Sequence, residues 1–190
     1  MPRTRKGFVD GRTFRALLKI CPASTFTSAR RQVTHWLRAT IGMRLKELAG
    51  LMLADLDWKG GTVRIRQRKG QKDRRVPFHR NAQRAVLRYL SCRKDSFPDL
   101  WMTEERRPLS YGGFAVDLKR LVTLAGLRGV VKDACHIFRR TWAASAVRQG
   151  IPRQFIIAAA GWSTPAMQEE GAVDAFRDFD PFGGAGCRTL

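Results

Sequence analysis

The stretch CHIFRRTWAA at residues 135–144 places His136 three residues before Arg139 in an otherwise largely apolar run. On a helix, this spacing brings two side chains to the same face. A cation on a largely apolar face is costly unless a negative group lies against it. The counter-ion is therefore either a carboxylate of this protein or an anion that binds from outside.

A second concentration of cations lies at residues 59–80, which hold nine lysines and arginines and one acid, Asp73. The alternation in TVRIRQR predicts a strand over residues 62–68 with one basic face, and residues 74–78 predict the returning strand of a hairpin with Lys69 at its turn. A charged sheet face needs no ligand, but this excess favours a phosphate backbone as partner. The side chains predicted to contact DNA are Arg64, Arg66, Arg68, Lys72, Arg74 and, from the first stretch, Arg140.

A third candidate is Arg44 in GMRLKEL, which stands three residues before Glu47. As an exposed pair on a helix, the two would contribute little to stability. The surrounding residues 29–53 also allow a helix-turn-helix with Gly42 in the turn, which is a DNA-binding motif. That alternative stays open, although a basic hairpin follows where a third helix would be expected.

Helices must position most of these side chains, because apolar residues recur at helical spacing along the chain. Asn81 is the predicted N-cap of one of them. The predicted helices cover residues 12–20, 29–40, 45–53, 81–90, 110–125, 133–148, 152–160 and 163–179. With the hairpin, they predict one mostly helical domain over residues 12–180 with a small antiparallel sheet, between a basic lead-in at residues 1–11 and a Gly-rich flexible tail at residues 181–190.

The composition agrees with a polyanionic partner. The 190 residues carry a formal charge of +20, yet 44% of them are hydrophobic, which excludes a disordered tail. An anionic membrane surface is disfavoured because the sequence shows no long amphipathic basic helix with an aromatic edge and no stretch of membrane-spanning length. On charge alone, an RNA-binding basic protein remains a competitor.

The cysteines and the first residues of the sequence indicate the kind of cellular compartment. The four cysteines are scattered without a CxxC pair, which argues against a zinc site and against a disulfide framework. No apolar signal core follows the basic start MPRTRKGF. We therefore expect a soluble protein of a reducing compartment.

In their order along the chain, these segments resemble the catalytic domain of the tyrosine recombinases, the phage integrase family. IGMRLKELAGLMLADLDW resembles the family's first box, RKGQKDRRVPF its Lys-Gly-x-Lys-x-Arg-x-Val-Pro hairpin, HIFRRTWAA its His-x-x-Arg second box, and AAAGWSTPAM its Leu-Gly-(His/Trp)-Ser box. The resemblance runs from about residue 14 to at least residue 167. It implies an α+β, mostly helical DNA breaking-rejoining fold with a small three-stranded antiparallel sheet.

The resemblance assigns a role to each matching position. Arg44 and Arg139 would clamp the scissile phosphate, because planar guanidinium forks suit the extra negative charge of a five-coordinate phosphorus. Lys69 would protonate the leaving 5′ oxygen, and His136 would assist proton transfer.

Two further positions match. Trp162 stands where many members have histidine, and its indole N–H would donate to the phosphate while its ring supports the helix of the nucleophile. Glu47 would orient the catalytic side chains without contacting the phosphate itself.

The resemblance also implies a function and its partners. We expect site-specific DNA recombination or integration of a mobile element, on double-stranded DNA and as a homo-oligomer on that DNA, in the prokaryotic cytoplasm with the nucleoid. It implies no metal, no nucleotide or other cofactor, no membrane partner and no small-molecule substrate.

One departure from the family bears on catalysis. The nucleophilic tyrosine is expected about nine residues after Trp162, and that count reaches Gly171. The chain has two tyrosines, Tyr89 and Tyr111, and both precede Trp162. Glycine cannot attack phosphorus, so we predict that the chain alone does not cleave DNA. Three explanations stay open: loss of the nucleophile segment, a tyrosine supplied in trans as in part of the family, or a non-catalytic DNA-binding remnant or regulator.

Overall fold

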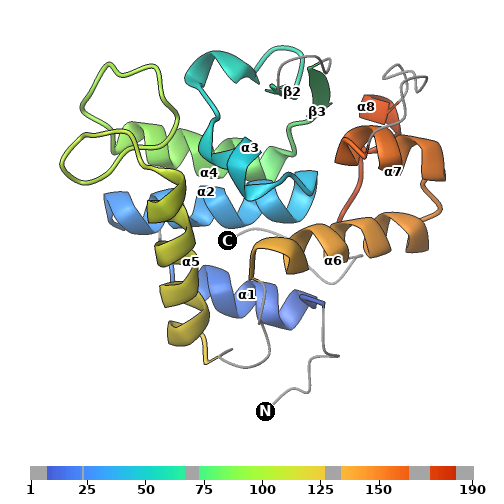
Figure 1. Cartoon of the computed structure of the whole chain (residues 1–190), viewed down its shortest axis with the longest axis horizontal. Coiled ribbons are helices and arrows are strands. Elements are labelled where there is room, and N and C mark those ends of the chain that lie inside the picture. The colour runs from blue at the N-terminus through green and yellow to red at the C-terminus, as the bar shows by residue number, and fades with distance from the viewer. Residues whose placement is uncertain (1–7, 23, 67–72, 127–133, 163–171, 183–190) are drawn as a thin grey trace.

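The computed structural model describes residues 8–22, 24–66, 73–126, 134–162 and 172–182. As predicted, these residues are mostly helical and include a three-stranded antiparallel sheet (Figure 1). In chain order the elements are α1 (Gly11–Lys19), α2 (Phe26–Ile41), α3 (Leu45–Ala49), the 3-10 helix η1 (Leu53–Asp55), β1 (Leu56–Asp57), β2 (Thr62–Ile65), β3 (Arg74–Pro77), α4 (Arg80–Ser91), α5 (Tyr111–Leu124), α6 (Ala134–Arg148), α7 (Arg153–Ala160) and α8 (Ala172–Ala175).

Helix α2 is the buried centre of the domain. It begins at a Thr25 cap whose side chain accepts from the Ser28 backbone N–H, and every residue from position 33 to position 41 is buried. It ends at Gly42, which adopts φ +64°, a left-handed conformation that favours glycine. A Cβ at this position would lie 2.5 Å from the Trp142 ring of α6, so close packing also requires glycine here.

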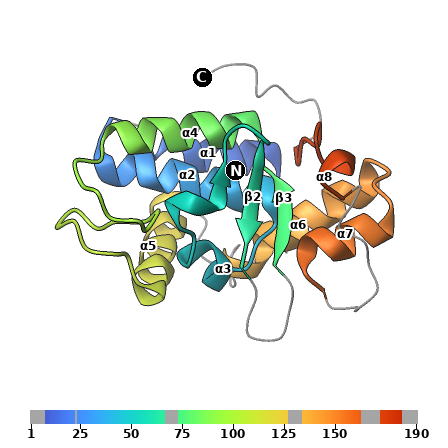
Figure 2. The ribbon, with the colours of Figure 1, turned by 90° about the horizontal axis from the view of Figure 1, so that it is seen from above.

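The sheet order is β1-β2-β3, with Val63 opposite Val76 and Ile65 opposite Arg74. Directly opposed residues share one face of a sheet, and all four of these side chains are buried. The other face carries Arg64 opposite Arg75, both exposed. Figure 2 shows the sheet between the α2 and α4 layer and the α6 and α7 pair.

Helix α2 begins at Phe26 rather than at residue 29, and β2 ends at Ile65, short of the strand predicted over residues 62–68. Two further predicted boundaries are wrong. The helix predicted over residues 45–53 stops at Ala49, because Leu51 and Leu53 pair their backbones with Leu100 and Pro98 instead of continuing the helix. With five residues, α3 is shorter than the second helix that a helix-turn-helix needs.

At the other wrong boundary, the cap of α4 is His79 rather than Asn81. The His79 ring accepts a hydrogen bond from the backbone N–H of Asn81.

The C-terminal part of the fold is built on α6 and α7. Helix α7 ends at Gly161, which adopts φ +61°, as the glycine in the sequence predicts. Trp142 of α6 packs on Phe176 and Phe179, which follow α8 directly. Of the helix predicted over residues 163–179, only α8 lies in the described part as helix, and residues 163–171 lie outside it. Within the described ranges, no helix has both the length and the apolar character needed to cross a membrane.

Candidate functional site

Arg139 of α6 is 6% exposed, and the structure identifies what surrounds its charge. Its guanidinium donates to the backbone carbonyls of Gly42 at 2.9 Å and Ala160 at 2.5 Å, and it lies 5.1 Å from the centre of the Trp162 ring. Carbonyls satisfy the donors but bring no full negative charge. Burial, and next the positive charge of Arg44, lower the pKa of Arg139 to about 10.

Arg44 caps the start of α3, and its side chain is 44% exposed. Its backbone N–H donates to Glu47 Oε2 at 2.7 Å, and its Nη1 donates to Glu47 Oε1 at 2.9 Å. Its Nη2 donates to the carbonyl of Gly161 at 3.0 Å. This guanidinium therefore has a fixed position and still faces solvent.

Arg74 of β3 is the third arginine at this place, and it is 3% exposed. It holds Glu47 with both ends of its fork, Nη1 to Oε1 at 3.1 Å and Nη2 to Oε2 at 2.9 Å. Its Nε donates to the carbonyl of Ala159 at 2.9 Å. Burial raises the pKa of Glu47, but the bonds and charge of Arg74, together with the bonds from Arg44, lower it below its usual value.

The end of α7 joins these side chains. The last carbonyls of a helix lack partners within the helix and carry the negative end of its dipole. Three successive carbonyls here, at positions 159, 160 and 161, accept from Arg74, Arg139 and Arg44 in that order. We call these three arginines and Glu47 the arginine cluster.

The arginine cluster brings together residues that are far apart in the sequence, from α3, β3 and α6 (Figure 2). Three guanidiniums against one carboxylate leave a formal local charge of +2. A compact group of fixed donors with unbalanced positive charge is a site for an anion of phosphate type.

The other predicted catalytic residues have different outcomes. His136 lies on α6, three residues before Arg139, with an exposed side chain. Trp162 follows α7 and is 43% exposed beside Arg139. Lys69 lies outside the described residues, between β2 and β3, and so does Gly171.

The predicted DNA-contact residues divide into two groups. Arg64 and Arg66 are exposed and pair with Asp73 at 2.6 Å and Asp55 at 2.9 Å. Arg140 is exposed on α6. The Arg64–Asp73 pair is open to solvent and therefore weak, so a phosphate can compete for Arg64. Arg66 is exposed as well, but its partner Asp55 is only 2% exposed. Two further candidates, Arg68 and Lys72, lie outside the described residues.

The placement of Arg74 corrects the prediction that it contacts DNA. Its guanidinium is buried and holds Glu47 and Ala159, so it cannot reach a DNA backbone without breaking these contacts. The strand pattern contained this signal, because Arg74 stands two residues before Val76 and therefore shares its buried face. Charge density along the hairpin hid that alternation.

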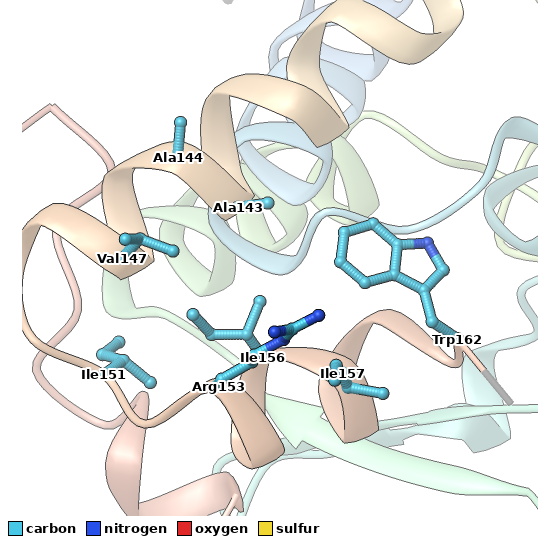
Figure 3. Close-up of a pocket in the computed structure, with 8 residues that line it drawn as sticks. All are labelled: Ala143, Ala144, Val147, Ile151, Arg153, Ile156, Ile157 and Trp162. Carbon is cyan, nitrogen blue, oxygen red and sulfur yellow. The ribbon is translucent and has the colours of Figure 1, made fainter. Parts of the chain in front are cut away.

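A pocket of about 750 Å³ opens between α6 and α7 (Figure 3). Trp162 stands at one side of it. Its lining is apolar apart from Arg153, so its chemistry differs from that of the cluster. The lining residues are Ala143, Ala144, Val147, Ile151, Arg153, Ile156, Ile157 and Trp162. In the part of the chain that the structure describes, no three His, Cys, Asp or Glu side chains group to hold a metal ion.

Comparison with known proteins shows which family this chain resembles. The family model of the phage integrase family matches residues 8–170. Tyrosine recombinase XerC of Listeria innocua serovar 6a is 32% identical over 133 residues, which cover 66% of this chain and 43% of that protein. Tyrosine recombinase XerA of Pyrococcus furiosus is 28% identical over 115 residues, 60% of this chain and 40% of that protein. The chain thus spans less than half the length of these curated relatives.

Solved structures share the fold. The crystal structure of XerA recombinase superposes with a TM-score of 0.67 at 20% identity, over 95% of this chain and 61% of that one. XerH site-specific recombinase bound to its difH substrate, in a pre-cleavage complex, gives a TM-score of 0.67 at 19% identity, over 90% of this chain and 49% of that one. Sequence boxes, fold and family match agree: the chain belongs to the phage integrase family.

Proposed function

We propose that this chain is a DNA-binding catalytic domain of the tyrosine recombinase type, which acts in site-specific recombination or integration of a mobile element. The observation that carries the proposal is the arginine cluster. Arg139 and Arg44 donate to adjacent carbonyls, at positions 160 and 161, and only one carboxylate balances the three guanidiniums. A DNA phosphodiester supplies the missing negative charge.

The chemistry follows from the donor types. Two guanidinium forks stabilise the charge that grows on phosphorus in the transition state. Lys69 in the hairpin would protonate the leaving oxygen, and His136 on the same helix as Arg139 would assist proton transfer. The exposed or hairpin cations Arg64, Arg66, Arg68, Lys72 and Arg140 would hold the backbone of a double-stranded DNA partner.

The two tyrosines support the expectation that the chain alone does not cleave. Tyr89 is fully buried, its hydroxyl accepts from the Met102 backbone N–H at 3.0 Å, and burial raises its pKa. Tyr111 begins α5, with the Lys46 ammonium 5.6 Å from its ring centre. Tyr111 is 47% exposed, and neither tyrosine stands on α6 or α7.

Covalent trapping on nicked duplex DNA tests the proposal. Such a substrate loses a short strand on cleavage and leaves the enzyme attached. We expect duplex binding that weakens with salt, and no adduct from the chain alone. An adduct on Tyr89 or Tyr111 would overturn the cleavage-deficient assignment, and no duplex binding at low salt would overturn the whole proposal. Preference for RNA over duplex DNA in competition would favour an RNA-binding basic protein instead.

The pocket beside Trp162 favours a second candidate, in which another subunit supplies the tyrosine on DNA. Its apolar lining suits an apolar segment from a partner, and Trp162 joins it to the arginine cluster. Mixing this chain with a relative whose two phosphate-binding arginines are replaced tests the idea. We expect the relative's tyrosine to become attached to DNA. No adduct in the mixture, with both proteins bound to the same duplex, would leave a non-catalytic DNA-binding regulator as the function.

A further inference from the structure

Arg74 is proposed above neither to bind the phosphate nor to contact DNA, yet its side chain makes three hydrogen bonds in the arginine cluster. Its three nitrogens reach both oxygens of Glu47 and the carbonyl of Ala159. Burying a guanidinium is costly unless its charge and donors are matched, and those of Arg74 are matched by a carboxylate and a carbonyl. Such a residue fixes the geometry of its partners.

We propose that Arg74 is a positioning residue that keeps Arg44 available to a phosphate, by taking up most of the charge of Glu47. The proposal rests on the proposed function, because it concerns the same phosphate site. It adds a residue that acts through Arg44 and does not touch the phosphate.

The contacts of Glu47 show a competition between two arginines. Its Oε1 accepts from Nη1 of both arginines, and its Oε2 accepts from the Arg44 backbone N–H and from Arg74 Nη2. Arg74 binds Glu47 through two guanidinium nitrogens in a buried setting, and such bidentate binding is stronger than a single hydrogen bond. Arg44 gives Glu47 one guanidinium nitrogen and remains 44% exposed.

The charge count gives the consequence. With Arg74 in place, one carboxylate serves two cations, and the cluster keeps a formal charge of +2. Without Arg74, Glu47 would pair with Arg44 alone, and the cluster would fall to +1. Removing the Arg74 and Glu47 charges together returns the cluster to +2, with Arg44 and Arg139 as its only ions.

The position of Arg74 in β3 adds a mechanical link. Its Nε bond to Ala159 lies next to the carbonyls that hold Arg139 and Arg44. A single side chain therefore connects the base of the hairpin, the start of α3 and the end of α7. The hairpin strand and the phosphate-binding arginines keep their relative positions through this side chain.

Binding of inorganic phosphate to the full chain tests the proposal. The readout is the NMR signal of the Trp162 indole N–H, assigned with Trp162→Phe, because this ring lies over Arg139. The variants are Arg74→Met, Arg74→Lys, and Arg74→Met combined with Glu47→Gln. Arg75→Met is the matched control, since it removes the same charge from the adjacent, 59% exposed side chain of β3. Thermal unfolding confirms that each variant folds.

We expect Arg74→Met to weaken phosphate binding on the order of tenfold, the size of one charge-assisted hydrogen-bond loss. The double variant should recover most of that loss, and Arg74→Lys should lie between wild type and Arg74→Met, because it keeps the charge without the fork. The control should match wild type. Recovery in the double variant separates charge competition from a structural role, which both changes would damage further.

The outcomes that would overturn this proposal are distinguishable from those that would overturn the proposed function. Wild-type binding with an unchanged Arg74→Met, or no recovery in a folded double variant, would exclude this role while leaving the phosphate site intact. If Arg74→Met does not fold, a folded Arg74→Lys with full wild-type affinity would exclude it as well. No phosphate response in wild type, or the same response in Arg44→Met, would instead remove the proposed function itself.

Discussion

Arg74 and Arg75 are neighbours in β3, yet they belong to two regions with opposite physics. Arg74 lies in the arginine cluster, 3% exposed and bound by a fork to Glu47. Arg75 belongs with Arg64 and Arg66 on the open face of the hairpin, where each pairs with one aspartate. We call Arg64 and Arg66, the two of these that are proposed to contact DNA, the ribbon arginines. The side chains are the same, and burial with the type of partner makes the difference.

The comparison shows how one residue type performs two tasks. In the arginine cluster, carbonyls and a shared carboxylate fix the donors before any ligand arrives, so little order remains to be imposed on binding. The ribbon arginines have exposed guanidiniums, which phosphates can approach one at a time and which salt screens. Preorganisation suits a single phosphate, and adaptable charge suits a long backbone.

The largest expected effect contrasts the two kinds of carboxylate. Glu47→Gln leaves the buried Arg74 charge unpaired and should lower the free energy of unfolding by about 3–5 kcal/mol. Asp73→Asn, the partner of the exposed Arg64, should lower it by less than about 1 kcal/mol. Urea unfolding of both variants measures the two changes. Equal losses would break the distinction between the regions.

A glycine in each region provides the next contrast. Gly42, whose carbonyl holds Arg139, has φ +64°, and an added Cβ would meet Trp142 at 2.5 Å. Gly61, between β1 and β2, has φ +61° with nothing within 4 Å of an added Cβ. Gly61→Ala should cost about 1 kcal/mol of backbone strain, and Gly42→Ala about 3 kcal/mol, because overpacking adds to it. Thermal unfolding tests the order, and the reverse order would contradict the packing described here.

Lowering the pH should destabilise the fold through a buried histidine. His35 of α2 is fully buried behind α6, stacked 6.0 Å from Phe138, and burial together with Arg38 lowers its pKa to about 3. The unfolded chain binds this proton near pH 6.5, so the neutral ring stabilises the fold above that pH. The contribution is lost as pH falls from about 6.5 toward 3.

The size of this acid effect follows from linkage. Between pH 6.5 and pH 5, His35 should cost the fold about 2 kcal/mol. His35→Phe should flatten the stability profile over that interval, as measured by urea unfolding at several pH values. Matching profiles in wild type and variant would show that the ring does not stay neutral.

The smallest effect concerns the ribbon arginines and DNA. Arg64→Met should weaken binding to any duplex by less than about tenfold and reduce the salt slope of the affinity by about 0.9, one phosphate contact. Arg74→Met should reduce this salt slope less than Arg64→Met does, because the Arg74 guanidinium is buried and acts on one phosphate through Arg44. Fluorescence anisotropy across a salt series measures both slopes, and an equal reduction would place Arg74 among the DNA contacts after all.

Much of the fold follows from local chemistry. The spacing of apolar residues predicts α1, α5, α6 and α7 within about two residues, because a helix with one buried face needs that period. Gly161 and Gly42 end helices where the backbone turns left-handed. The four family boxes in their order identify the family without coordinates.

Other features depend on contacts across the chain. Helix α3 stops at Ala49 because residues 51–53 pair with a loop about fifty positions later, and no local pattern announces that partner. The hairpin reads as uniformly basic, although Arg74 shares the buried face of Val76. The alternation along the strand predicts that Arg74 points to the buried face. Only the tertiary structure shows that Glu47 is its partner on that face.

The sequence by itself predicted the residue types of a phosphate site, since arginine, histidine and lysine have the same side-chain chemistry in any fold. The sequence did not predict which groups hold these arginines in position. Backbone carbonyls at a helix end are the same in every sequence, so only the folded arrangement could bring Arg74, Arg139 and Arg44 to successive carbonyls of α7. Side-chain chemistry is local, whereas the balance of charges among distant side chains exists only once the chain has folded.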